Sequence, residues 1–122
     1  QIVYLNHKNV IFTSAEAQKV DETTYVEFNQ IKKSLKNAAT EAAGLVGYAK
    51  YIDGTIQSML IEANLNIKTI TELQYLTSLL ADKIDSEFTY DFDIQVLVYS
   101  QNGLKAVIIK DKGKNAKSSI FY

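Results

Sequence analysis

The sequence predicts an α+β domain in which an antiparallel sheet of about five to seven strands carries two main helices. Two stretches repeat apolar residues every three or four positions, as amphipathic helices do. Shorter β-branched and aromatic runs lie before, between and after them. Asp-Gly and Asn-Gly pairs, which are typical of tight hairpin turns, stand between several of these runs. The expected order of elements is therefore β(β)-α-ββ-α-βββ.

The N-terminal part is expected to form a strand or hairpin over about residues 2–12, followed by the first main helix. Two strand-like runs, 2–5 and 10–12, flank a polar NHKN cluster. Thr13 with Glu16 and Thr24 with Glu27 have the S/T-x-x-E spacing that caps a helix start. Behind Thr24, one apolar stripe follows helical spacing: Tyr25, Phe28, Ile31, Leu35, Ala38 and Ala42. We expect this helix to end at Gly44.

Residues 44–61 could form either a helix or a hairpin, and the sequence favours the hairpin. A helix would contain Gly44, Gly47 and Gly54, each costing about 1 kcal/mol relative to alanine. Asp53-Gly54 lies between two β-rich runs and suits a type I′ turn, which needs positive φ at both central residues.

The second main helix is expected over 69–87, and three strands are expected after it. Thr69 and Glu72 form a third capping box, with an apolar stripe behind them. Strands follow over 92–99, 104–109 and 118–122. In the first of these, alternation points Phe92, Ile94, Val96 and Val98 inward, with Leu97 and Tyr99 on the opposite side.

Composition indicates one compact domain, residues 1–122, and excludes several function classes. Apolar residues make up 47% of the chain and charged residues 22%, as in ordinary globular domains. A net charge of −1 argues against nucleic-acid binding, and no apolar run is long enough for membrane insertion. The chain has no cysteine, which removes thiol chemistry and zinc–thiolate sites. Without a recognisable export signal, a cytoplasmic location is the expectation.

From Gly44 onward the chain resembles the Roadblock/dynein light-chain family. The matching features are Gly44-Leu45-Val46-Gly47, the Asp53-Gly54 turn, the helix over 69–87, and the strand pair from Gln95 to Ile109. They cover roughly two thirds of the chain and are mostly fold-forming turns. The extra N-terminal segment 2–12 is not part of this pattern and makes longin- and profilin-like proteins neighbouring relatives. The resemblance implies homodimers or family heterodimers whose sheets join edge to edge, and work as adaptors or as regulators of small Ras-like GTPases.

Two surfaces are candidates for binding, and no residue is a candidate for catalysis, cofactor binding or metal binding. Strand 92–99 is long and apolar, so at a sheet edge it would tend to pair with another chain. The predicted interface residues are Tyr75, Leu79, Phe92, Ile94, Leu97 and Tyr99. The predicted docking residues for an acidic partner are Lys110, Lys112, Lys114 and Lys117, although a solvated hairpin tip explains these lysines as well. Asp91 and Asp93 could face one cation, but a third carboxylate is missing nearby, so solvated charges at the strand entry are favoured.

The expected function is a non-catalytic dimerisation and interaction module without a cofactor, with a small GTPase as a candidate partner. An alternative stays open: a structural subunit of a viral, pilus or surface assembly that associates through exposed sheet edges.

Overall fold

Six strands and three helices make up the part of the chain that the structure, a computed structural model, describes: residues 7–39, 43–101 and 103–121. In chain order they are β1 (His7–Phe12), α1 (Ala15–Val20), α2 (Glu22–Ala38), β2 (Gly44–Ile52), β3 (Thr55–Leu65), α3 (Ile70–Glu87), β4 (Asp93–Ser100), β5 (Gly103–Lys110) and β6 (Lys117–Ile120). The predicted α+β class and the two main helices are confirmed.

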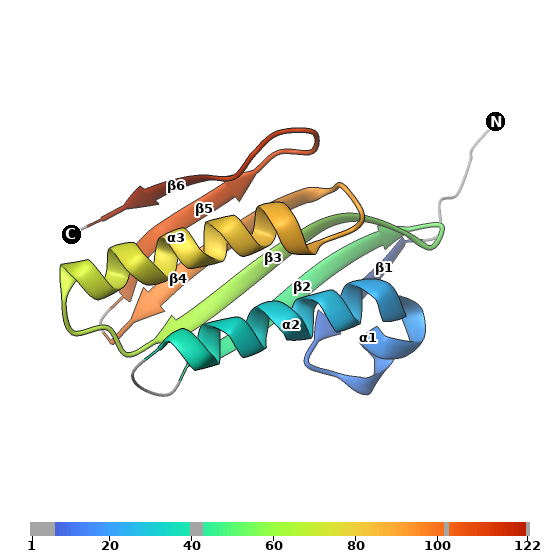
Figure 1. Cartoon of the computed structure of the whole chain (residues 1–122). Helices are drawn as coiled ribbons and strands as arrows, with labels where there is room; N and C mark the ends of the chain where they lie inside the picture. Colours follow the sequence, from blue (N-terminus) through green and yellow to red (C-terminus); the bar gives the residue numbers. More distant parts are fainter. Residues whose placement is uncertain (1–6, 40–42, 102, 122) are drawn as a thin grey trace.

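The strands form one sheet in the order β1-β2-β3-β4-β5-β6. Neighbouring strands are antiparallel except β3 and β4, which pair in parallel from Ser58–Asp93 to Leu65–Ser100. The exception follows from α3, because a helix between two strands carries the chain back along the sheet before the next strand begins. All three helices lie on the near side of the sheet in Figure 1. The domain therefore has two layers.

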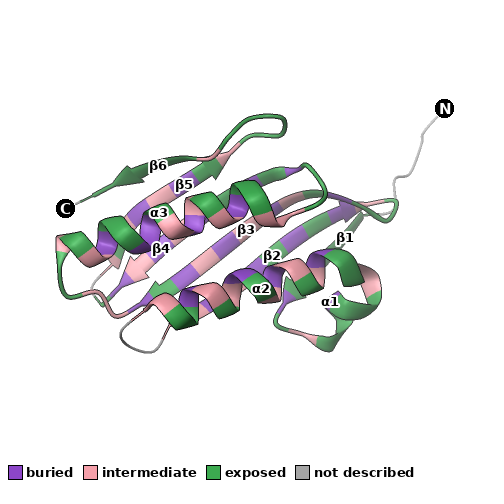
Figure 2. Cartoon of the chain, viewed as in Figure 1, coloured by how far each residue is buried: buried purple, intermediate pink, exposed green. Residues whose placement is uncertain are grey.

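The core lies between the sheet and the helices. α2 buries Phe28, Ile31 and Leu35, and α3 buries an apolar stripe along its length. Purple and non-purple residues alternate along the strands in Figure 2, because successive strand residues point to opposite faces. Phe12 and Phe28 meet edge to face with ring centroids 5.6 Å apart, which joins β1 to α2.

The hairpin interpretation of residues 44–61 is confirmed. Asp53 has φ 50° and Gly54 has φ 78°, the positive values that a type I′ turn requires. β2 and β3 leave this turn as an antiparallel pair.

One of the three predicted capping boxes is confirmed. Thr69 precedes α3 and its side chain accepts a hydrogen bond from the Glu72 amide at 3.1 Å. The prediction that α2 starts at Thr24 is wrong, because Asp21 caps the helix three residues earlier by accepting from the Thr24 amide. α2 also ends at Ala38, earlier than expected.

Of the strand and the hairpin expected over about residues 2–12, the described residues show a strand. Residues 7–12 form one continuous strand paired with β2, which runs through His7, Lys8 and Asn9 of the NHKN cluster. The run 2–5 and Ala42 lie outside the described residues. Thr13 caps no helix: α1 begins after Ser14, whose side chain makes no capping bond, and Glu16 instead pairs with Lys8 at 3.1 Å.

Candidate interaction surface

The side of the sheet that faces away from the helices, here called the open face, is the most unusual surface of the molecule. No helix in the described ranges covers it. Its apolar side chains come from five strands: Ile11, Val46, Tyr48, Leu60, Leu97, Tyr99, Val107 and Ile109. Ile11 is 49% exposed, Tyr48 42% and Ile109 48%. Exposed apolar groups that gather in this way are typical of binding surfaces.

Strand register arranges these side chains in two adjoining rows across the sheet. The first row runs Ile11, Tyr48, Leu60, Gln95, Ile109 and Lys117. The second runs Val46, Glu62, Leu97, Val107 and Ser119. Cross-strand neighbours on one face lie roughly 5 Å apart, so the apolar groups form a continuous belt.

Polar groups at the middle and the rim of the belt give it a charge pattern. The Glu62 carboxylate, through its negative charge and a hydrogen bond, raises the pKa of the Tyr48 hydroxyl. Next to the belt, Lys50, Ser58 and Asp93 form a polar row. An interacting partner would therefore meet an apolar belt that has one carboxylate in its middle and charges of both signs at its rim.

Two shallow hollows interrupt the open face. One, of about 310 Å³, is lined by residues of β3, β4 and β5 that include Leu60, Gln95 and Ile109. The other, of about 210 Å³, lies over β5 and β6 and is lined by Val107, Ile109 and Lys117 among others. Ile109 is the wall between them. Such relief suits the side chains of a protein surface better than a small molecule, which needs deeper enclosure.

The structure divides the predicted interface residues among three places. Leu97 and Tyr99 lie half-buried on the open face. Tyr75, which is 56% exposed, and the half-buried Leu79 lie on α3, on the other side of the molecule. Phe92 and Ile94 are only 1% and 3% exposed, so they belong to the core and are out of a partner's reach in this fold.

The idea that strand 92–99 is a sheet edge is wrong. β4 lies between β3 and β5, and its backbone is paired on both sides. The belt residues of β2, β3 and β5 were missed by the sequence prediction. These strands carry apolar residues on both faces, whereas a sheet with one covered face needs apolar residues only at alternate positions. This excess of apolar residues is the signal that could have found them.

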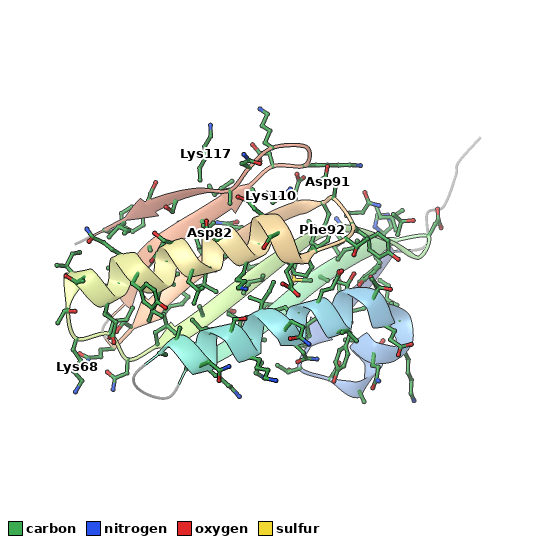
Figure 3. All side chains as sticks on the ribbon, viewed as in Figure 1. Lys68, Asp82, Asp91, Phe92, Lys110 and Lys117 are labelled. Atoms are coloured by element: carbon green, nitrogen blue, oxygen red, sulfur yellow. The ribbon has the colours of Figure 1, made fainter. Side chains whose placement is uncertain are left out.

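Of the predicted lysine docking residues, Lys110 ends β5, Lys117 begins β6, and Lys112 and Lys114 lie on the loop between these strands. Three aspartates hold this loop in place. Asp93 accepts from the Lys112 amide at 2.7 Å, Asp91 from the Gly113 amide at 3.1 Å, and Asp85 from the Ala116 amide at 2.8 Å. Lys110 is an ion-pair partner of Asp91 at 3.0 Å (Figure 3). The Gly113 amide and Lys110 lower the pKa of Asp91. Lys112, Lys114 and Lys117 are exposed, and binding of an acidic partner there stays a prediction.

The described residues were also compared with the requirements of a metal site and of a membrane span. No group of three or more potential metal-ligating side chains occurs among them. Asp91 and Asp93 serve the loop after β5, through the amides described above. Within the described ranges, no helix combines the length and hydropathy that a membrane crossing requires.

A family comparison identifies the group of proteins to which this sequence is related. The model of the family described as CamS sex pheromone cAM373 precursor matches residues 2–116. The chain belongs to the CamS family. None of the curated proteins that were compared matches it.

Solved structures of CamS-type proteins share the fold. A sex pheromone staph-cAM373 precursor superposes with a TM-score of 0.87 at 20% identity, over 98% of this chain and 43% of that one. A sex pheromone precursor from Lactobacillus salivarius gives a TM-score of 0.89 at 17% identity, over 97% and 35%. The C-terminal domain of the staph-cAM373 precursor from Staphylococcus aureus gives 0.84 at 20% identity, over 97% and 35%. The chain spans less than half the length of each of these structures.

Family membership corrects three expectations. The resemblance to Roadblock/dynein light chains, with longin- and profilin-like neighbours, is wrong, since the match is to CamS. The GTPase-regulating role loses its basis, because it depended on that resemblance alone. The cytoplasmic location is also wrong, since the family is described as precursors of a sex pheromone, and a pheromone acts outside the cell that makes it. The shared features were hairpin turns and an amphipathic helix, which recur in unrelated α+β folds.

Proposed function

We propose that this chain is a non-catalytic binding domain of a sex pheromone precursor, located outside the cytoplasm, and that it binds a protein through the open face. The precursor role and the location are proposed from the family description. The binding role is proposed from one observation, the apolar belt on the open face.

The belt favours binding because a partner that covers it removes apolar surface from water, and the domain does not have to change shape for this. Each Å² of apolar surface that a partner covers contributes roughly 25 cal/mol before the costs of association. Four of the five strands that carry the belt, β2, β3, β4 and β5, are paired on both sides, so most of its side chains are held on a stiff support. A surface that is already ordered loses little entropy on binding.

Carbene footprinting would test the proposed binding surface. Protein isolated from the native source is labelled and compared with the 122-residue chain at nanomolar concentration, at which the chain alone is monomeric. We expect peptides containing Tyr48, Leu97 and Ile109 to be labelled less in the native protein, because a partner covers them. Val26 and Tyr75, both exposed on the helical side, are the internal controls and should be labelled equally in both samples. If the open face is labelled equally in the two samples, as the control residues are, the proposal is refuted.

The proposed location has a separate test. Intact cells are treated with a protease that cannot enter them, and the domain is then detected with an antibody. Digestion of the domain while a cytoplasmic marker survives is the expected result. Survival of both would contradict the location.

A second candidate is a structural subunit that joins its neighbours through sheet edges. β1 and β6 each pair with one strand only among the described residues, so each leaves a free edge. Every residue of β6 is exposed. However, lysines on both edge strands, Lys8 and Lys117, oppose edge pairing. Electron microscopy of concentrated protein distinguishes the candidates, because edge pairing in one direction gives filaments, whereas binding through the open face gives discrete particles.

A further inference from the structure

We propose that the partner on the open face is a second copy of this chain, whose own open face packs against it as the second sheet of a sandwich. This inference rests on the proposed binding role of the open face. The two-fold axis runs parallel to the strands, over the boundary between β3 and β4. Aligned packing of two sheets in this way is a common arrangement in β-sandwiches.

The axis determines which strands face each other. β3 of one copy lies over β4 of the other, and β2 lies over β5, because the order in the sheet is β2-β3-β4-β5. The axis is parallel to the strands, so each cross-strand row stays at its own level and meets the same row of the partner. The strand register therefore predicts the contacts.

The charges at the rim are complementary under this symmetry. Lys50 is level with Ser58 and Asp93. Ile94 pairs with Lys110, so continuing this register by one residue places Asp111, which follows β5, opposite Asp93. Both Lys50 and Asp111 are exposed. Asp111 lines the same two hollows of the open face as Ile109, so it lies on this side of the sheet. Lys50 of one copy then faces Asp111 of the other, and the symmetry makes this contact twice.

The apolar belt is complementary as well. Tyr48 on β2 meets Ile109 on β5, and Val46 meets Val107, again twice each. Tyr48 projects from its sheet, whereas Ile109 is flanked by the two hollows. Tyr48 would therefore pack against the Ile109 side chain and the edges of the hollows beside it, and large aromatic side chains anchor many protein interfaces.

The polar groups at the centre of the interface have partners within reach. Glu62 would face Leu97 of the second copy, and Tyr48 is its diagonal neighbour on the same sheet, with the hydroxyl within reach of the carboxylate. Gln95 would face Leu60 and lies one strand away, diagonally from Glu62, so its amide is available to the same carboxylate.

A stable dimer would need only a small part of the surface of the domain. A typical interface buries about 800 Å² on each partner. The accessible surface of the domain is 7264 Å², so this is roughly a ninth of it. The open face is one of the two broad sides of a two-layered domain, and its belt extends across five strands.

Sedimentation equilibrium of charge-reversal variants would test the second copy. The wild-type chain should dimerise in the micromolar range. Lys50→Asp and Asp111→Lys should each weaken the dimer at least about tenfold, because each turns two attractions into two repulsions. The double variant should recover most of the affinity, since the pair is restored with its signs exchanged. Lys33→Asp, a reversal of an exposed charge on α2, is the matched control and should leave the dimer unchanged.

Two results would overturn the inference. A wild-type chain that stays monomeric at the highest concentration reached excludes the second copy, as does a double variant no tighter than the single ones. Both charges are exposed, and circular dichroism would verify that every variant is folded. A monomeric chain combined with a protected open face in the native protein would refute the second copy alone, and the partner on the open face would then be a different polypeptide segment. A monomeric chain, together with an open face that is unprotected in the native protein, would refute both proposals.

Discussion

At the level of single residues, Gly47 is the glycine with the closest neighbours among those described, at the point where β2 passes under α2. A Cβ atom there would lie 3.0 Å from Phe28 Cε2, 3.2 Å from Met59 Sδ and 3.3 Å from Phe12 Cβ. Gly47→Ala should therefore destabilise the fold by about 1–3 kcal/mol, the usual cost of overpacking. Urea unfolding measures the change. Gly44→Ala is the control, because no atom lies within 4 Å of a Cβ built there, and equal effects of the two substitutions would refute the packing argument.

Tyr51 joins β2 to the start of α2 through one buried hydroxyl. Its hydroxyl donates to Asp21 Oδ2 at 2.9 Å, and Asp21 also caps the helix. Burial, followed by the nearby Asp21, raises the pKa of Tyr51 far above its usual range. Tyr51→Phe should cost about 1–3 kcal/mol near neutral pH, as the loss of a hydrogen bond to a charged group does.

The pH dependence of stability provides a second measurement on Tyr51. A raised folded-state pKa means that its contribution is complete below an unfolded-state pKa of about 10 and declines as the pH rises further. The wild-type chain should thus lose stability more steeply than Tyr51→Phe above about pH 10. Parallel curves, measured by urea unfolding at several pH values, would contradict this assignment.

At the level of elements, α3 depends on Thr69 for its start. The Thr69 hydroxyl accepts from the Glu72 amide, and Glu72 Oε1 accepts in turn from the Lys68 amide at 3.3 Å. Thr69→Ala should lower the unfolding free energy by about 1 kcal/mol. Thr71→Ala, which removes the same side chain two residues later at another exposed position, is the comparison and should have little effect. Thermal unfolding monitored by circular dichroism measures both.

The loop between β5 and β6 should loosen when Asp91 loses its charge. Asp91 holds Lys110 and the Gly113 amide, and its lowered pKa means that this contribution is present above an unfolded-state pKa of about 4 and is lost as the pH falls below that. In NMR spectra, the Gly113 amide should move upfield in Asp91→Asn at neutral pH, and in the wild type only on acidification. Asp82→Asn, an exposed change on α3, is the control. A Gly113 signal that responds alike to both substitutions would refute the loop assignment.

Elements whose signals are local were predictable, and those that depend on distant partners were not. The turn at Asp53-Gly54 and the start of α3 at Thr69 depend on neighbours within four residues. The start of α2 was missed because Thr24 has a capping pattern but is buried, while Asp21 is the cap. The parallel pairing of β3 and β4 depends on residues 35 apart. Likewise, the contact of Asp91 with Gly113 spans 22 residues, so the role of the aspartates was not visible in the sequence.

The residues of the open face were predictable to the same extent: within one strand, but not across strands. Leu97 and Tyr99 were predicted because alternation within one strand separates them from the core side. Their neighbours Leu60 and Val107 join them only through strand order and register. A belt built from five strands therefore appears in the sequence as scattered apolar residues.

For the molecule as a whole, stability should fall from the middle of the sheet toward its edges. β3 and β4 are paired on both sides and lie beneath the helical layer, whereas β6 is paired on one side and every residue in it is exposed. In native-state hydrogen exchange, we expect the amides of Ile61 and Val96 to exchange only through global unfolding. Paired amides of β6 should exchange roughly a hundredfold faster, which corresponds to a free energy of opening about 2.7 kcal/mol lower.

Exchange at β6 also distinguishes the two ways in which the domain could associate. A partner on the open face contacts side chains and leaves the free edge of β6 accessible, so the gradient should persist at every protein concentration. Pairing along the edge would supply β6 with a second strand, and its exchange would then slow toward that of β4 as the concentration rises. Concentration-independent exchange at β1 and β6, together with a dimer in sedimentation, is the combination that association through the open face predicts and edge pairing does not.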